Sequence, residues 1–139
     1  MPIVECGFLH VAPNLSPADT LVQYGPTIWV DIGFDPRVFG TSVPAANFQP
    51  VPPAQNVPAL VDTGALESCI DEQLAQQLQL PLVDQVQVAG VGGSTTLNVY
   101  LAHIALPGLG AMQYGRFSGA HLATGGQQHK AIIGRTLLK

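Results

Sequence analysis

The chain has few charged residues, few cysteines and no long apolar segment, and each shortage excludes a class of protein. Only 10% of its 139 residues are charged and its five basic residues are scattered, so we expect no nucleic-acid partner. Two cysteines, Cys6 and Cys69, are too few for a disulfide framework and indicate reduced thiols, with a single bridge as the alternative. Neither a membrane-length apolar run nor a secretory signal is visible, so we expect no membrane partner and a cytoplasmic location.

What is abundant points to a small β-rich domain. The hydrophobic fraction of 47% and the length of 139 residues suit one domain with one core. The 12 prolines and 15 glycines are many for a helical protein and are typical of a chain that turns often between short strands. We therefore predict a mostly β fold with one or two short helices.

The first clear strand signal lies at residues 27–34. Ile28, Val30 and Ile32 alternate there with Trp29, which is the pattern of a strand with one buried face. Residues 35–58 contain six prolines and few periodic apolar residues, so they predict a long surface loop.

Shorter signals flank this loop. Residues 59–61 form a short apolar run, which suits a strand buried on both faces. Residues 71–80 predict a helix that Pro81 ends. In the first 26 residues, a break at residues 14–17 separates short extended pieces that we place around Val4 and Val22.

A glycine-tipped hairpin is predicted further along the chain. Alternating runs at residues 85–88 and 97–101 flank Gly90-Val91-Gly92-Gly93. Weaker strands are predicted near residues 101–106 and 111–122.

Three segments carry residues that suit chemistry, although each has an ordinary explanation when taken alone. Asp62-Thr63-Gly64 follows a buried apolar run and would serve equally as a turn. Residues 90–93 would make an ordinary hairpin tip, and no Lys-Ser/Thr follows them as in a phosphate-binding loop. Ile132-Ile133-Gly134-Arg135 would make a buried strand that ends in a glycine turn.

Taken together and in this order, the three segments resemble the active-site loop, the flap tip and the hydrophobic-hydrophobic-glycine segment of retropepsin-like (retroviral-type) aspartic proteases. The resemblance covers roughly residues 27–139 and is nearer the cellular and bacterial members than the viral ones. It implies an acid-protease half-barrel protomer that works as a two-fold homodimer without a cofactor or metal. Such an enzyme would be an aspartic endopeptidase acting on extended peptide segments.

The resemblance also assigns roles to residues. Asp62, Thr63 and Gly64 would be the catalytic triplet. Because the chain has a single Asp-Thr-Gly, two chains must each give one Asp62 to a catalytic pair. Residues 88–95 would close as a flap, and Ile132 with Val91 would line side-chain pockets. The full set of implied substrate-binding residues is Ala65, Leu66, Ala89, Gly90, Val91, Gly92, Gly93 and Ile132.

Structural support is implied for Ile133, Gly134 and Arg135, with Gly134 letting a last helix pack against the Asp62 loop. In this sequence Leu66 stands where the retroviral enzymes have the acidic partner of that arginine. Arg135 should therefore pair with Glu67 or face solvent.

A second departure concerns the ends of the chain. The retroviral chain runs on after its Leu-Leu pair to a terminal strand that interleaves with its twin, whereas this sequence stops at Lys139. We expect residues 1–26 to supply dimer contacts instead, and truncation of a longer natural chain is the alternative explanation. Two other functions stay open: a retropepsin-like dimer that binds a peptide or partner with little or only self-directed cleavage, and a small β-barrel binding module with accidental motif matches.

Overall fold

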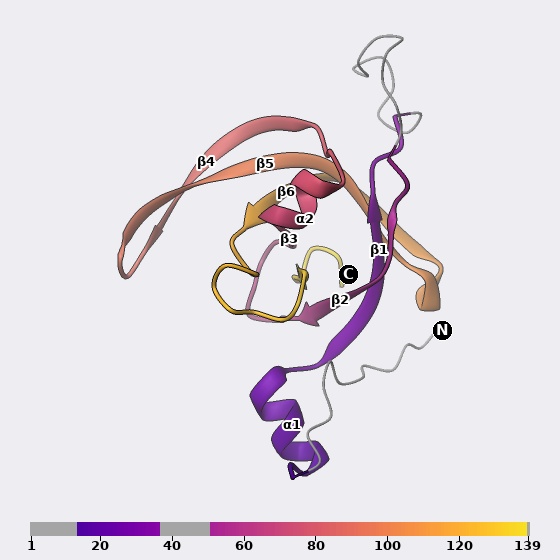
Figure 1. Cartoon of the computed structure of the whole chain (residues 1–139), viewed down its shortest axis with the longest axis vertical. Helices are drawn as coiled ribbons and strands as arrows, with labels where there is room; N and C mark the ends of the chain where they lie inside the picture. The colour runs from indigo at the N-terminus through magenta and orange to yellow at the C-terminus, as the bar shows by residue number, and fades with distance from the viewer. Residues whose placement is uncertain (1–13, 37–50, 139) are drawn as a thin grey trace.

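The computed structural model of the chain describes residues 14–36 and 51–138, and it is mostly β with two short α-helices, as predicted (Figure 1). The predicted piece around Val4 lies outside these residues. The elements, in chain order, are α1 (Pro17–Tyr24), β1 (Thr27–Gly33), β2 (Ala54–Val61), β3 (Cys69–Asp71), α2 (Glu72–Gln77), β4 (Leu82–Gly90), β5 (Gly93–Leu106), the 3₁₀-helix η2 (Pro107–Leu109), β6 (Ala111–Ala120) and β7 (Ala131–Ile133).

All seven strands belong to one sheet in the order β1-β2-β7-β3-β6-β5-β4. β1 also pairs with β5, so the first six strands of that order close into a barrel and leave β4 outside it. Two neighbouring pairs are parallel, β2 with β7 and β3 with β6, while the others are antiparallel. The closed arrangement places the end of β2 next to the end of β7.

The alternation predicted for β1 is confirmed. Ile28, Val30 and Ile32 are buried in the barrel core, whereas Trp29 is 42% exposed on the outer face. The core continues with apolar residues of other elements, among them Ile70, Ile104 and Ile133.

β2 is longer than predicted, so the assignment of residues 54–58 to a loop was wrong. Pro58 is tolerated inside the strand because its carbonyl accepts a hydrogen bond from the Lys130 amide at 2.9 Å and its missing N–H is not needed on that side. The expectation of a strand buried on both faces was also wrong, since Val57 and Ala59 are buried while Leu60 and Val61 are only partly buried.

The extended piece predicted around Val22 was wrong, because that residue lies in α1. The Ser16 side chain accepts from the Asp19 amide at 3.1 Å and Pro17 follows at the first helical position, so the apparent break is a helix start. The predicted helix at residues 71–80 exists but is shorter: it runs from Glu72 to Gln77, with Asp71 as its N-cap.

Helix α1 joins the barrel through Gly25, which has a φ of +77°. A Cβ on this glycine would lie 2.5 Å from Leu60 Cδ1, so the elbow between α1 and β1 is packed directly on β2. In Figure 1, α1 projects from the end of the barrel where β1 begins.

The glycine-tipped hairpin is confirmed as β4 and β5, with Val91 and Gly92 at its tip. β5 continues without interruption to Leu106, so the weaker strand predicted near residues 101–106 is part of it, and β6 matches the second weak prediction. Within residues 14–36 and 51–138, no helix is long and apolar enough to cross a membrane.

Candidate active site

The Asp62 turn begins where β2 ends and is fixed by its own backbone. The Asp62 amide donates to the Ile133 carbonyl at 3.0 Å, which ties the turn to β7. The Asp62 Oδ1 atom accepts from the Gly64 amide at 2.8 Å, so one carboxylate oxygen is already oriented. Asp62 is half-buried, whereas Thr63 and Gly64 are exposed on the surface.

The segment after β7 braces the segment after the Asp62 turn. The Arg135 amide donates to the Ala65 carbonyl at 3.0 Å, and the Thr136 amide donates to the Leu66 carbonyl at 3.1 Å. The buried Ser68 hydroxyl accepts from the Gly134 amide at 3.0 Å. Two of the three segments singled out in the sequence are therefore hydrogen-bonded to each other.

Gly134 is required by this close approach. A Cβ at Gly134 would lie 2.5 Å from the Glu67 carbonyl oxygen and 3.1 Å from that of Ala65. The prediction that Gly134 packs a last helix was wrong, because residues 135–138 form turns rather than a helix. The glycine instead lets backbone meet backbone beside the carboxylate.

Arg135 faces solvent, which is the second of the two environments predicted for it. Its side chain is exposed, and it forms no ion pair with Glu67 in the part of the chain that the structure describes. Leu66, where the retroviral acid would stand, is 61% exposed. The support that Arg135 gives comes from its backbone amide.

Ile132 lies in β7 between β2 and β3, opposite Leu60 and Cys69, and is partly buried. Burial raises the pKa of the neighbouring Cys69 thiol to about 11, against a smaller opposing effect of the Ile132 backbone. The thiol therefore stays protonated at neutral pH and packs as an apolar group, and Cys69 is a free cysteine.

The remaining segment, Ala89 to Gly93 at the predicted flap tip, forms no hydrogen bond with the Asp62 turn in the described part of the chain. It forms the far end of the β4–β5 hairpin, which reaches away from the barrel in Figure 1, and Val91 at its tip is fully exposed. Between the hairpin base and the loop after Asp62 is a hollow of about 320 Å³, whose lining includes Glu67, Ser68 and Val86. Another hollow, of about 600 Å³, lies beside Phe34 and His103, and none of the predicted site residues lines it.

Sequence reasoning missed two buried polar residues that hold this region. Ser68 binds the Gly134 amide, and Asp71 caps α2 while its Oδ1 accepts from the Ala123 amide at 2.9 Å. Their only sequence signal is a polar side chain on each side of the apolar pair Cys69-Ile70.

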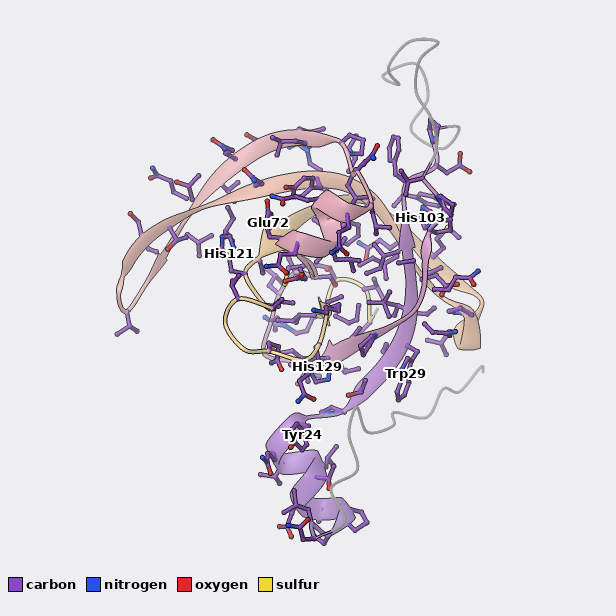
Figure 2. All side chains as sticks on the ribbon, in the orientation of Figure 1. Tyr24, Trp29, Glu72, His103, His121 and His129 are labelled. Atoms are coloured by element: carbon purple, nitrogen blue, oxygen red, sulfur yellow. The ribbon has the colours of Figure 1, made fainter. Side chains whose placement is uncertain are left out.

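His129 is a third buried polar residue. Its Nε2 atom lies 2.7 Å from the Thr27 hydroxyl, and the side chain is fully buried at the start of β1 (Figure 2). Burial lowers the pKa of His129 below its ordinary value of 6.5. The imidazole is therefore neutral in the folded protein at neutral pH.

A half-barrel with one Asp-Thr-Gly turn at a strand end, braced by an Ile-Ile-Gly segment, has the architecture of an aspartyl protease domain. A family model described as aspartyl protease matches residues 54–137, from the first residue of β2 to the turns after β7. The chain therefore belongs to this family of retropepsin-like aspartyl proteases, which is found in bacteria. No curated protein matches the chain.

Proposed function

We propose that the protein is an aspartic endopeptidase whose active site forms from two copies of the chain, each giving one Asp62 carboxylate. The observation that carries this proposal is the geometry of the turn. A carboxylate on a tightly hydrogen-bonded backbone sits next to exposed Thr63 and Gly64. The Gly64 amide donates to Oδ1 of Asp62, so the other carboxylate oxygen remains available for chemistry.

The chemistry needs two such carboxylates. Carboxylates ~3 Å apart share one proton, so one acts as base toward a water molecule while the other donates to the peptide carbonyl oxygen. The chain has a single Asp-Thr-Gly, so one copy supplies half of the pair. A two-fold axis beside the turn supplies the other half, and Thr63 then hydrogen-bonds across that axis.

The exposed apolar side chains of α1 support a dimer contact by the N-terminal residues. Val22 is 87% exposed and Leu21 is 43% exposed on a helix that is anchored beside Leu60, two residues before the carboxylate. A second copy would cover these side chains. The dimer then depends on contacts made by α1.

Substrate binds as an extended peptide between the Asp62 turn and the β4–β5 hairpin, which acts as the flap. Backbone groups of the flap and of Gly64 add strand-like hydrogen bonds to the peptide. Val91 at the flap tip and Ile132 beside the turn provide apolar contacts, so the residues flanking the cut are apolar. Residues 89–93 and 65–66 complete the binding surface.

The test is hydrolysis of a denatured protein at several acidic pH values by the wild type, by Asp62→Asn and by Asp31→Asn as the control. Asp31 lies in β1, where its Oδ1 atom accepts from the Asn56 amide at 3.1 Å, and it does not line the hollow beside the Asp62 loop. We expect cleavage by the wild type and by the control but not by Asp62→Asn. Cleavage by Asp62→Asn, or by none of the three, would overturn the assignment. Tight peptide binding without cleavage would favour a binding dimer.

Subunit mixing tests the shared site directly. An excess of Asp62→Asn protein should suppress wild-type activity, because mixed dimers contain a single carboxylate. Specific activity should also fall on dilution as dimers dissociate. If neither an excess of Asp62→Asn protein nor dilution lowers the specific activity, one chain is sufficient for catalysis.

A further inference from the structure

Glu72, at the start of α2, is a charged residue that the proposed chemistry does not use, and it is buried with 7% of its surface exposed. Its Oε1 atom accepts three hydrogen bonds: from the Tyr100 hydroxyl at 2.6 Å, from Asn98 Nδ2 at 2.8 Å and from Gln76 Nε2 at 3.1 Å. Figure 2 shows Glu72 between α2 and the curved strands of the hairpin. Helix α2 and β5 are thus joined by a single oxygen atom.

The network continues into the hairpin. Asn98 Oδ1 accepts from Gln85 Nε2 at 3.0 Å, and these two residues are cross-strand partners in β5 and β4. The Asn98 side-chain oxygen therefore accepts a hydrogen bond within the hairpin, and the side-chain nitrogen donates one to Glu72. A continuous chain of side-chain bonds runs from β4 to α2 at the hairpin base.

The carboxylate is held without a counter-ion. Within residues 14–36 and 51–138, no Lys or Arg pairs with Glu72, and its Oε2 atom is buried without a hydrogen-bond partner. A Cβ at Gly119 would overlap Oε2, so the glycine makes room for it. Burial, and then the hydrogen bond to Glu72, raise the pKa of Tyr100, which keeps its hydroxyl protonated as a donor.

A buried carboxylate with no cation relies on its neutral donors, and losing one donor is costly. In the described part of the chain, residues 85–90 of β4 pair only with residues 93–98 of β5, and every residue of β4 is exposed. Outward of Val99, Asn98 is thus the last described residue whose side chain is hydrogen-bonded to the rest of the fold, through Glu72.

We propose that Glu72 is a positioning residue that sets the angle at which the hairpin leaves the barrel, through Asn98. It thereby sets the gap in which a peptide lies above the Asp62 turn. This inference rests on the proposed function only where it concerns substrate, because the angle itself is a property of the fold.

The sharpest test exchanges the two partners. Asn98→Asp places a second carboxylate against Glu72 and should raise KM for an extended peptide about tenfold, with kcat within about threefold of the wild type. Adding Glu72→Gln to that variant restores one amide and one carboxylate in contact, with their roles exchanged. The double variant should return KM to within about threefold of the wild type. Gln77→Ala, on the exposed side of α2, is the control and should change nothing.

Hydrogen exchange of the backbone amides of residues 82–97 gives a reading that does not require proteolysis. Asn98→Asp should speed exchange in this hairpin while leaving the core strands β1 and β7 protected, and the double variant should slow it again.

Tyr100→Phe is a milder variant, with a smaller change in the same direction, if Asn98→Asp fails to fold. Unchanged hairpin exchange in the single variants, or a double variant no better than Asn98→Asp, would overturn the role of Glu72. Loss of proteolysis with this exchange pattern intact would count against the proposed function alone.

Discussion

The Asp62 turn and the β4–β5 hairpin lie on the same half-barrel and are built in opposite ways. The turn is held by backbone bonds to the segment after β7 and by the buried Ser68. From residue 85 to residue 97 the hairpin has only its own cross-strand bonds within the described residues, and its side chains are exposed except for the partly buried Leu97. In the proposed function, the carboxylate must be aligned within a fraction of an ångström for chemistry, whereas the hairpin must move as a flap to admit a peptide. The difference in construction suits these two proposed tasks.

Asp62→Asn should have the largest effect on activity. Removing one acid of a shared pair should lower kcat by at least about a thousandfold, because the pair can no longer hold and transfer its proton. The asparagine still offers an oxygen to the Gly64 amide, so the thermal midpoint should stay within about 2 °C of the wild type. A large drop in that midpoint would mean that the turn depends on the charge for its structure.

Matched glycine substitutions test the contrast in stability. Gly134→Ala forces a methyl group against the Glu67 carbonyl and should cost ~2–4 kcal/mol of unfolding free energy. Gly92→Ala, at the hairpin tip, meets nothing within 4 Å and should change stability by less than about 0.5 kcal/mol. Urea unfolding of both variants measures the difference. Equal costs would remove the distinction between a braced and a free region.

Acid should weaken the barrel through His129. Because burial lowers its pKa from 6.5, the unfolded chain binds a proton where the folded chain does not. The stability tied to the neutral imidazole is complete above about pH 6.5 and is lost as pH falls toward the folded pKa.

His129→Gln keeps a hydrogen-bonding side chain that does not titrate, so its stability should fall less between about pH 7.5 and about pH 5. His103, whose pKa burial also lowers, is unchanged in both proteins and cancels in the comparison. Parallel loss of stability in wild type and variant, followed by urea unfolding, would exclude His129 as the source.

Val91→Ser should give the smallest change in stability, within about 0.5 kcal/mol, because the side chain is fully exposed. If the hairpin tip contacts substrate, KM for a peptide with apolar residues at the cut should rise about three- to tenfold, through lost apolar contact. Steady-state kinetics on one peptide series checks this. An unchanged KM would remove Val91 from the binding surface while leaving the hairpin in place.

Local patterns were sufficient for the parts of the fold that depend on neighbouring residues. The alternation in β1 and the glycine-tipped hairpin follow from side-chain period and turn chemistry, and both were predicted. Helix α1 was missed because Ser16 and Pro17 were interpreted as a break, although the same two residues start a helix. The start of β2 was hidden by Pro52 and Pro53 before it and by Pro58 within it.

The residues of the candidate site were likewise predicted only in part. The Asp62 triplet and the Ile-Ile-Gly segment were found by their composition and order. Ser68 and Glu72 were not, because each owes its environment to partners far along the chain: Gly134 is 66 residues from Ser68, and Asn98 is 26 residues from Glu72. A single sequence carries no trace of such pairs.

The contact between Gly25 and Leu60 gives the N-terminal helix a mechanical route to the chemistry. Leu60 precedes the carboxylate by two residues near the end of β2, so β2 is a direct structural connection between α1 and the Asp62 turn. If α1 contacts a second copy of the chain, dimer formation also aligns the Asp62 carboxylate. The isolated subunit would then not cleave other proteins.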